Sequence, residues 1–240
     1  AIWAPPGPSR MAGDWGWLVL AGALFALELN LWAGALTLTT VANATLLANM
    51  TPVFAAGAAW VFFRESVRAA ALFGGAIALA GAVTLTLARA QAGQGDAAHG
   101  WLGDALGLSA AVGYAGYLLI VRAVGPRIGV GPVMFWASAV SMVCTFAASQ
   151  ALGEDLIPQT WRGWAILVGL GVLVQAGGQG LIAYGVARLP IAVSTVLLWT
   201  QPLVAAALSW ALFGEELGPL ALAGAALVLA GIYVVQRARQ

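Results

Sequence analysis

The sequence predicts an all-α, polytopic membrane protein built from inverted repeats, and three observations support this fold class. Hydrophobic residues make up 62% of the chain and charged residues 8%, whereas a soluble domain carries about 25% charged residues. Eight apolar runs are each long enough to cross a bilayer, which needs about 20 residues of helix. The end of the chain also repeats an earlier part of it. We therefore expect a ten-helix fold of two five-helix repeats, with eight of the helices in this chain.

The predicted spans are separated by short joins that contain Gly, Pro or charged residues. Residues 88–100 and 153–163 form the two loops with real polar content, and neither is long enough to be a domain. None of the spans has the pattern of a signal peptide. The spans cover residues 15–36, 40–63, 68–89, 101–123, 131–152, 163–187, 190–213 and 217–238.

Charge excludes one class of partner. The chain has a net charge of +1, and its basic residues, all of them Arg, are scattered between apolar runs. Because a nucleic-acid surface needs a basic patch or stripe, we expect no nucleic-acid binding. The expected partners are the lipid bilayer and a small-molecule substrate.

An internal duplication relates two parts of the chain by a shift of 150 positions. When residues 41–90 are set over residues 191–240, 18 of 50 positions are identical, whereas roughly a tenth would match by chance in a chain so rich in Ala, Leu and Gly. Equivalent spans are five places apart in the order of the spans, an odd number, so equivalent helices cross the membrane in opposite senses. This is the inverted-repeat design of many secondary transporters.

The distribution of Arg supports this topology independently. If the C-terminus is cytoplasmic, eight Arg residues lie inside and only Arg89 and Arg162 lie outside, as the positive-inside rule requires. The turn at 64–68 carries two Arg, whereas the equivalent turn at 214–218 has Gly at both positions. We therefore expect a multi-pass protein of a bacterial-type inner membrane with a cytoplasmic C-terminus.

The same register predicts the domain organisation. Residue 151 corresponds to residue 1, so the two spans in 101–152 have no partners in the first half. Residues 1–90 are expected to be the last three helices of the first repeat, and residues 101–240 the five helices of the second. The first residue is Ala rather than Met, which also favours a natural start further upstream, with about two helices preceding this chain.

Four segments carry a family resemblance. VANATLLANMTPVFAAGAAWVFFRE followed by LFGGAIALAGAVTL, and STVLLWTQPLVAAALSWALFGEEL followed by LALAGAALVLAGIYVV, resemble the paired signatures of the drug/metabolite transporter superfamily, EamA type. The resemblance covers nearly the whole chain and implies ten helices in two inverted repeats. It also implies transport of small metabolites, often amino-acid export, but it is weak on substrate identity.

Two prolines lie at equivalent positions in the middle of predicted spans, Pro52 and Pro202. A proline inside a helix removes one backbone hydrogen bond and clashes with the carbonyl four residues earlier, which here frees the carbonyls of Ala48 and Leu198. Such carbonyls need a partner from a side chain, water or substrate. The prolines are therefore candidate hinges beside a central site, and kinks that only improve packing are the alternative.

Polar residues accompany these prolines. Thr45 and Asn49 share a helix face, and the repeat places Thr195 and Trp199 at the corresponding positions. An amide facing an aromatic ring would suit a zwitterion or a planar metabolite, so all four are candidate substrate-binding residues. The alternative is an interhelical hydrogen bond from Asn49 and ordinary packing by Trp199.

Glu28 is an acid inside the first span, and no Arg lies in the interior of any span to pair with it. An intramembrane acid is a functional candidate, so Glu28 could exchange a proton during transport or meet a substrate amine. Trp32 lies one turn further along the same face. A permanently protonated, structural Glu28 is the alternative.

Two further polar pairs complete the predicted site. Gln175 and Gln179 are four residues apart in the sixth span, and Tyr114 and Tyr117 are three apart in the fourth. Both pairs could line the cavity, although the glycines around the glutamines equally suit close helix packing. We interpret the repeated glycines of the third and eighth spans as packing residues.

The sequence argues against an enzyme. Hydrolysis needs a nucleophile with a base, or a metal with His or acidic ligands, and the sole His, His99, lies in a loop. We predict no cofactor and no metal. An alternating-access exporter of amino acids or similar metabolites is the favoured function, and a channel-like facilitator or an exporter of other small metabolites or drugs is the alternative.

Overall fold

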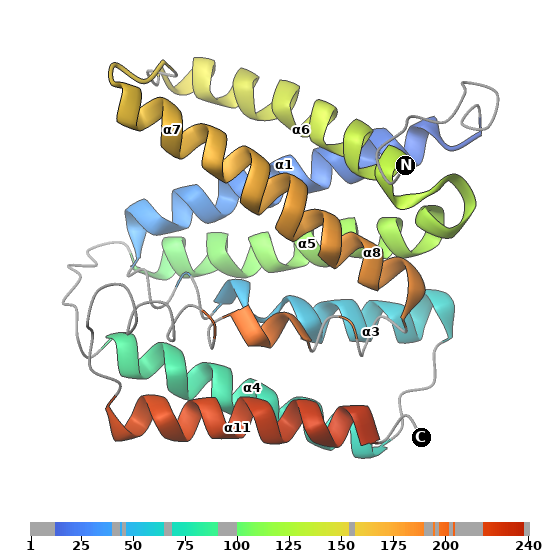
Figure 1. The fold of residues 1–240 in the computed structure, drawn as a ribbon, viewed down its shortest axis with the longest axis vertical. Helices are drawn as coiled ribbons and strands as arrows, with labels where there is room; N and C mark the ends of the chain where they lie inside the picture. The colour runs from blue at the N-terminus through green and yellow to red at the C-terminus, as the bar shows by residue number, and fades with distance from the viewer. Residues whose placement is uncertain are drawn as a thin grey trace. The chain divides into compact units, whose positions relative to one another are not determined.

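The structure is a computed structural model, and it describes residues 13–39, 44, 47–64, 69–90, 100–153, 157–189, 194, 197–201, 204 and 218–237. These residues are helical apart from short turns, so the all-helical prediction is confirmed for them (Figure 1). Among them, four stretches are long and apolar enough to cross a membrane: Trp15–Leu38, Gly100–Ile128, Val130–Leu152 and Trp161–Arg188.

The helices follow the predicted spans closely, with two exceptions. The span expected over 40–63 is not one helix, because α3 begins only at Thr51. The span expected over 190–213 lies largely outside the described residues. The elements are α1 (Trp15–Leu38), α3 (Thr51–Phe63), α4 (Ala69–Ala90), α5 (Gly100–Ile128), α6 (Val130–Leu152), α7 (Trp161–Gly169), the π-helix η2 (Leu170–Gln179), α8 (Gly180–Arg188), the 3₁₀ turn η3 (Leu197–Trp199) and α11 (Pro219–Arg237).

Helix ends follow local sequence rules. Gly129, between α5 and α6, has φ 92°, and Gly153, after α6, has φ 69°. Residues with a Cβ atom rarely adopt such positive φ angles, so both positions favour glycine. The Thr160 hydroxyl accepts a hydrogen bond from the Gly163 N–H at 3.1 Å, which caps the start of α7. These residues set where the long apolar helices stop and restart.

The chain forms two compact units, each of which draws on both predicted repeats. Unit 1 consists of Ala1–Asn30 and Gly116–Leu189, and unit 2 of Leu31–Ala115 and Pro190–Gln240. Helices α1 and α5 each contribute to both units.

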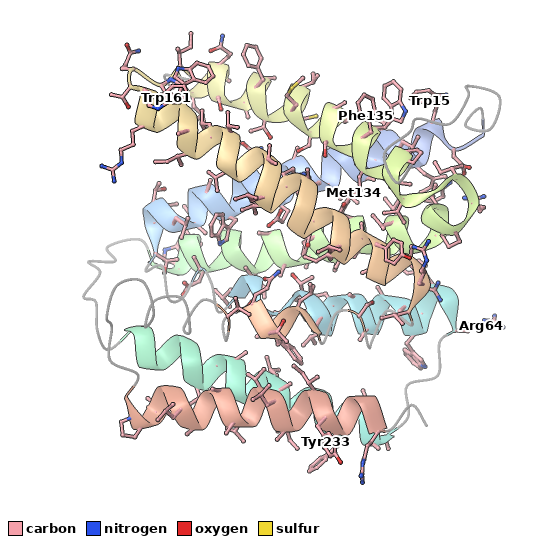
Figure 2. The ribbon with its side chains drawn as sticks, viewed as in Figure 1. Trp15, Arg64, Met134, Phe135, Trp161 and Tyr233 are labelled. Carbon is pink, nitrogen blue, oxygen red and sulfur yellow. The ribbon has the colours of Figure 1, made fainter. Side chains whose placement is uncertain are left out.

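Unit 1 is held together by close contacts of α6 and α5 with α1. A Cβ added at Gly22 would lie 2.7 Å from the Ala137 carbonyl oxygen, so only glycine permits this approach of α1 to α6. The rings of Phe25 and Tyr117 lie 4.9 Å apart between α1 and α5. Trp15 of α1 packs edge-on against Trp136 of α6 at 4.7 Å, and Figure 2 shows Trp15 beside the neighbouring Phe135 at this end of the unit.

Unit 2 contains an antiparallel pair of helices, α4 and α11, which lie side by side (Figure 1). A Cβ added at Gly74 would lie 2.8 Å from the Gly231 carbonyl oxygen, and one added at Gly81 would lie 2.7 Å from the Gly224 oxygen. Tyr233 occupies the side of α11 that points away from α4 (Figure 2). The structure thus agrees with the interpretation of these four glycines as packing residues.

Candidate functional site

The predicted site residue Pro52 starts a helix instead of kinking one. It lies in the first turn of α3, after a turn at Asn49 and Met50, so the predicted mid-helix position is wrong. The physical reason is that the first helical turn leaves its N–H groups unbonded, and a proline there gives up no hydrogen bond. The span is therefore interrupted at this point, and Pro202, the equivalent residue, lies outside the described residues.

The interruption exposes the Ala48 carbonyl, as the sequence predicted, and a hydroxyl satisfies it. Thr51 Oγ1 donates to the Ala48 oxygen at 2.8 Å and lies 3.4 Å from the Ala111 oxygen of α5. Thr51 is buried, and both contacts lie within unit 2. A half-buried carbonyl without a partner is costly, so Thr51 stabilises the broken backbone and ties the start of α3 to α5.

The two repeats meet at this interruption. The indole N–H of Trp199 donates to the backbone oxygen of Asn49 at 2.7 Å, and Trp199 is only 3% exposed. These residues are equivalent in the duplication, being 150 positions apart. Trp199 closes the 3₁₀ turn η3, whose three residues are equivalent to 47–49. Both spans therefore depart from α-helix at the same place in the repeat, and the two departures are bonded to each other.

The side-chain amide nitrogen of Asn49 has no hydrogen-bond partner in the described part of the chain. This atom, Nδ2, is buried. A buried amide donor in this condition costs on the order of 1–3 kcal/mol, so it is expected to bond something in another state of the protein. The candidate residues Thr45 and Thr195 lie outside the described residues.

Glu28 and Trp32 lie one turn apart on α1, Glu28 half-buried and Trp32 at the surface. No ion pair of Glu28 is present within the described part of the chain, where Arg127 pairs with Asp14 at 2.9 Å. Glu28 thus keeps the unpaired character that made it a candidate, and its role in transport stays a prediction.

Sequence reasoning missed the polar contacts made by the neighbour of Glu28 on α1. The Nδ2 of Asn30 donates to the Ala26 oxygen at 2.7 Å and to Thr145 Oγ1 of α6 at 3.2 Å. Thr145 belongs to a row of hydroxyl residues at helical spacing on α6, a signal readable in the sequence. The members of this row are Ser138, Ser141, Thr145 and Ser149.

The two glutamine candidates lie on the π-helix η2. Gln175 Nε2 donates to Ser138 Oγ of α6 at 3.3 Å, while Gln179 is half-buried at the end of η2. π-helical segments are rare and occur frequently at functional sites. An apolar pattern does not distinguish a π-helix from an α-helix, so this segment cannot be predicted as a π-helix from its residues.

The tyrosine candidates differ in their surroundings. Tyr117 is 1% exposed, and its hydroxyl donates to Met134 Sδ at 2.9 Å, so it lies in the packed core of unit 1. Tyr114 is half-buried. A substrate-lining role for Tyr117 therefore requires a rearrangement that Tyr114 does not need.

One acid in a long helix also escaped the sequence analysis. Asp104 lies in the second turn of α5, and its Oδ1 accepts a hydrogen bond from Thr39 Oγ1 at 2.8 Å. Its position near the helix start, within GWLGDALG, is typical of an acid that favours the positive end of the helix dipole. The described residues contain no cluster of three or more His, Cys, Asp and Glu that could hold a metal ion.

Comparisons with known proteins match one transporter family and two relatives named as an exporter and a transporter. The sequence profile of the EamA-like transporter family matches residues 1–87 and 101–237. The probable terminal-alkyne amino-acid exporter of Streptantibioticus cattleyicolor is 31% identical over 203 residues, which are 81% of this chain and 64% of that protein. The uncharacterized transporter YetK of Bacillus subtilis is 24% identical over 198 residues, which are 82% of this chain and 60% of that protein.

The chain thus spans about three fifths of the length of these curated relatives. A crystal structure superposes on it with a TM-score of 0.79 at 23% identity, covering 98% of this chain and 80% of the other. At this identity, the match shows a shared fold.

Proposed function

The chain belongs to the EamA-like transporter family, and from this premise we propose that the protein exports amino acids or related small metabolites across a bacterial inner membrane by alternating access. Membership places it among transporters and not among enzymes. The amino-acid export named for the Streptantibioticus relative supports the substrate class. The half-buried Glu28 supports coupling to protons, because an intramembrane acid is a frequent proton carrier in transporters.

The observation that carries this proposal is the bond between Trp199 and Asn49. In a pair of repeats related by a twofold axis, a residue that contacts its own equivalent lies on that axis. Secondary transporters with inverted repeats bind substrate near the midplane, where discontinuous helices of the two repeats meet. The spans interrupted at Asn49 and Trp199 are discontinuous and are bonded to each other, which supports a substrate site beside them.

The glycine crossing supports the same symmetry. Gly74 faces Gly231 and Gly81 faces Gly224, and the shift of 150 positions converts each pair into the other. This reciprocity, together with the antiparallel course of α4 and α11, is what an inverted repeat produces. It supports residues 1–90 as the end of one repeat and residues 101–240 as the other.

The inverted topology can be tested by thiol labelling of the full-length protein. In a Cys144→Ser background, Ser66→Cys and Glu216→Cys should react with a membrane-impermeant reagent from opposite sides, with Ser66→Cys reached from the cytoplasm because its turn is rich in Arg. Labelling of both positions from the same side would rule out the inverted repeat.

Transport itself is tested by counterflow, which also separates a carrier from a channel. Vesicles with the full-length protein are preloaded with an unlabelled neutral amino acid, and uptake of the labelled compound is followed. A carrier should accelerate uptake, because the loaded site returns faster than the empty one. Uptake that does not respond to preloading would show a channel, and an absence of uptake would exclude the amino acid tested.

A further inference from the structure

Trp199 and Asn49 occupy equivalent positions but contribute different hydrogen-bonding groups to their contact. Trp199 supplies its side chain and Asn49 its backbone oxygen, at 2.7 Å. The side-chain amide of Asn49, the group equivalent to the indole, is a buried donor without a partner among the described residues. Half of a reciprocal contact is therefore made in this conformation, and the donor for the other half is present but unused.

Alternating access in an inverted repeat gives this unused donor a partner. If the two repeats exchange conformations between the inward-facing and outward-facing states, each residue takes over the role of its equivalent. The contact from the Trp199 side chain to the Asn49 backbone then becomes a contact from the Asn49 side chain to the Trp199 backbone. Because Asn is shorter than Trp, the two turns must approach each other more closely in the second state.

We propose that Trp199 and Asn49 form a hydrogen-bond switch on the pseudo-twofold axis. The Trp199 indole donates to the Asn49 carbonyl in the conformation seen here, and the Asn49 amide donates to the Trp199 carbonyl in the opposite-facing conformation. The switch rests on the proposed alternating access. The Asn49 amide has its hydrogen bond only in the opposite-facing conformation. The Trp199 indole therefore stabilises one conformation, and the Asn49 amide stabilises the other.

A second pair of equivalent residues offers positions at which cysteine labelling can report the inward-facing and outward-facing states. Ala44 and Ser194 are 150 positions apart and buried, and in an inverted repeat they lie toward opposite membrane faces. Ala44→Cys and Ser194→Cys would be introduced separately into the full-length protein in a Cys144→Ser background, since Cys144 is exposed. The quantity measured is the ratio of their labelling rates with a water-soluble maleimide, which follows the populations of the two states and needs no substrate.

The switch predicts opposite effects from the two halves of the pair. Trp199→Phe removes the indole donor while keeping an aromatic ring, and it should change the labelling ratio about five-fold, as expected for one net hydrogen bond. Asn49→Leu should change the ratio by a similar factor in the other direction. The double variant should return the ratio toward its original value. Trp199→His, which retains a ring N–H, should lie closer to the parent than Trp199→Phe.

Ratios that move in the same direction in both variants, or by less than two-fold in either, would overturn the switch. If Trp199→Phe unfolds, labelling rises at both cysteines, and Trp199→His and Asn49→Leu then test the switch in its place. Counterflow in the same vesicles separates this test from the proposed function. Opposite shifts of the labelling ratio without amino-acid uptake would support the switch and exclude the tested amino acid as substrate. Amino-acid uptake without opposite shifts would support the proposed transport function and overturn the switch.

Discussion

The α4–α11 crossing and the Asn49–Trp199 contact are two places where equivalent parts of the duplication meet, and they differ in chemistry. At the crossing, glycine faces glycine in both reciprocal pairs, so the symmetry of the repeat is preserved. At the interrupted spans, an amide stands in one repeat and an indole in the other. Packing can be symmetric because both helices need the same close approach. A binding site gains from asymmetry because an asymmetric substrate requires different groups on its two sides.

The largest effect should come from breaking the symmetric crossing. Gly81→Ala would place a Cβ 2.7 Å from the Gly224 oxygen, against backbone that cannot rotate away. We expect a loss of at least about 1–3 kcal/mol in the free energy of unfolding, measured by denaturant or thermal unfolding in detergent.

Gly57→Ala is the matched control, since a Cβ at Gly57 of α3 meets nothing within 4 Å. There, alanine should stabilise the helix by about 0.5–1 kcal/mol, because glycine has the lower helix propensity. Equal effects of the two substitutions would show that the close crossing is not a determinant of stability.

The asymmetric contact should respond in affinity more than in stability. Asn49→Leu removes a buried donor that has no partner among the described residues, so unfolding should change little. If the donor binds substrate, the half-saturation concentration should rise about ten-fold, the value of one good hydrogen bond. Trp199→Ala should also weaken binding of any substrate with an apolar or planar part.

Asn30→Leu provides the contrast, because the Asn30 amide is already bonded to Ala26 and Thr145. This variant should lose about 1 kcal/mol of stability. An Asn49→Leu protein that loses stability and keeps its affinity would show that Asn49 is structural and would remove it from the site.

The fold could be predicted further than the site, for a physical reason. Long apolar runs and repeated glycines are local patterns. An apolar run long enough to cross the bilayer predicts a helix, and repeated glycines on a helix predict a close helix crossing. Pro52 is predicted as a hinge in the middle of a helix, which is wrong, because its place in the first turn of α3 depends on where the helix starts, and an unbroken apolar pattern does not reveal that. The bonds of Asn30 to Thr145 and of Gln175 to Ser138 join residues distant in sequence, so no local pattern predicts them.

A third effect concerns flux and its pH dependence. The equivalent of Glu28 in the second repeat is Gly178, so the acid is a further asymmetric element. If its carboxyl carries a proton during the cycle, Glu28→Gln should flatten the pH dependence of flux while the protein stays folded. If it binds a substrate amine, flux should fall at every pH tested.

Asp104→Asn is the control for this experiment, because the Asp104 carboxyl is engaged by the Thr39 hydroxyl and an amide oxygen can still accept that bond. Its pH profile should match that of the parent protein. An unchanged profile and normal flux in Glu28→Gln would show instead that Glu28 is structural.

The smallest effect should come from the hydroxyl that closes the interrupted span. Thr51→Val keeps the shape of the side chain but removes the hydroxyl that donates to the half-buried Ala48 oxygen. We expect Thr51→Val to lower the free energy of unfolding by about 1 kcal/mol, measured by thermal or denaturant unfolding in detergent.

Thr84→Val is the matched control, because the Thr84 hydroxyl also bonds a preceding carbonyl of its own chain segment, that of Ala80, but within continuous α4, where that carbonyl has a helical partner. Thr84→Val should therefore cost less than Thr51→Val. If the two cost the same, the Ala48 carbonyl has another partner, and the interruption before α3 is stabilised without Thr51.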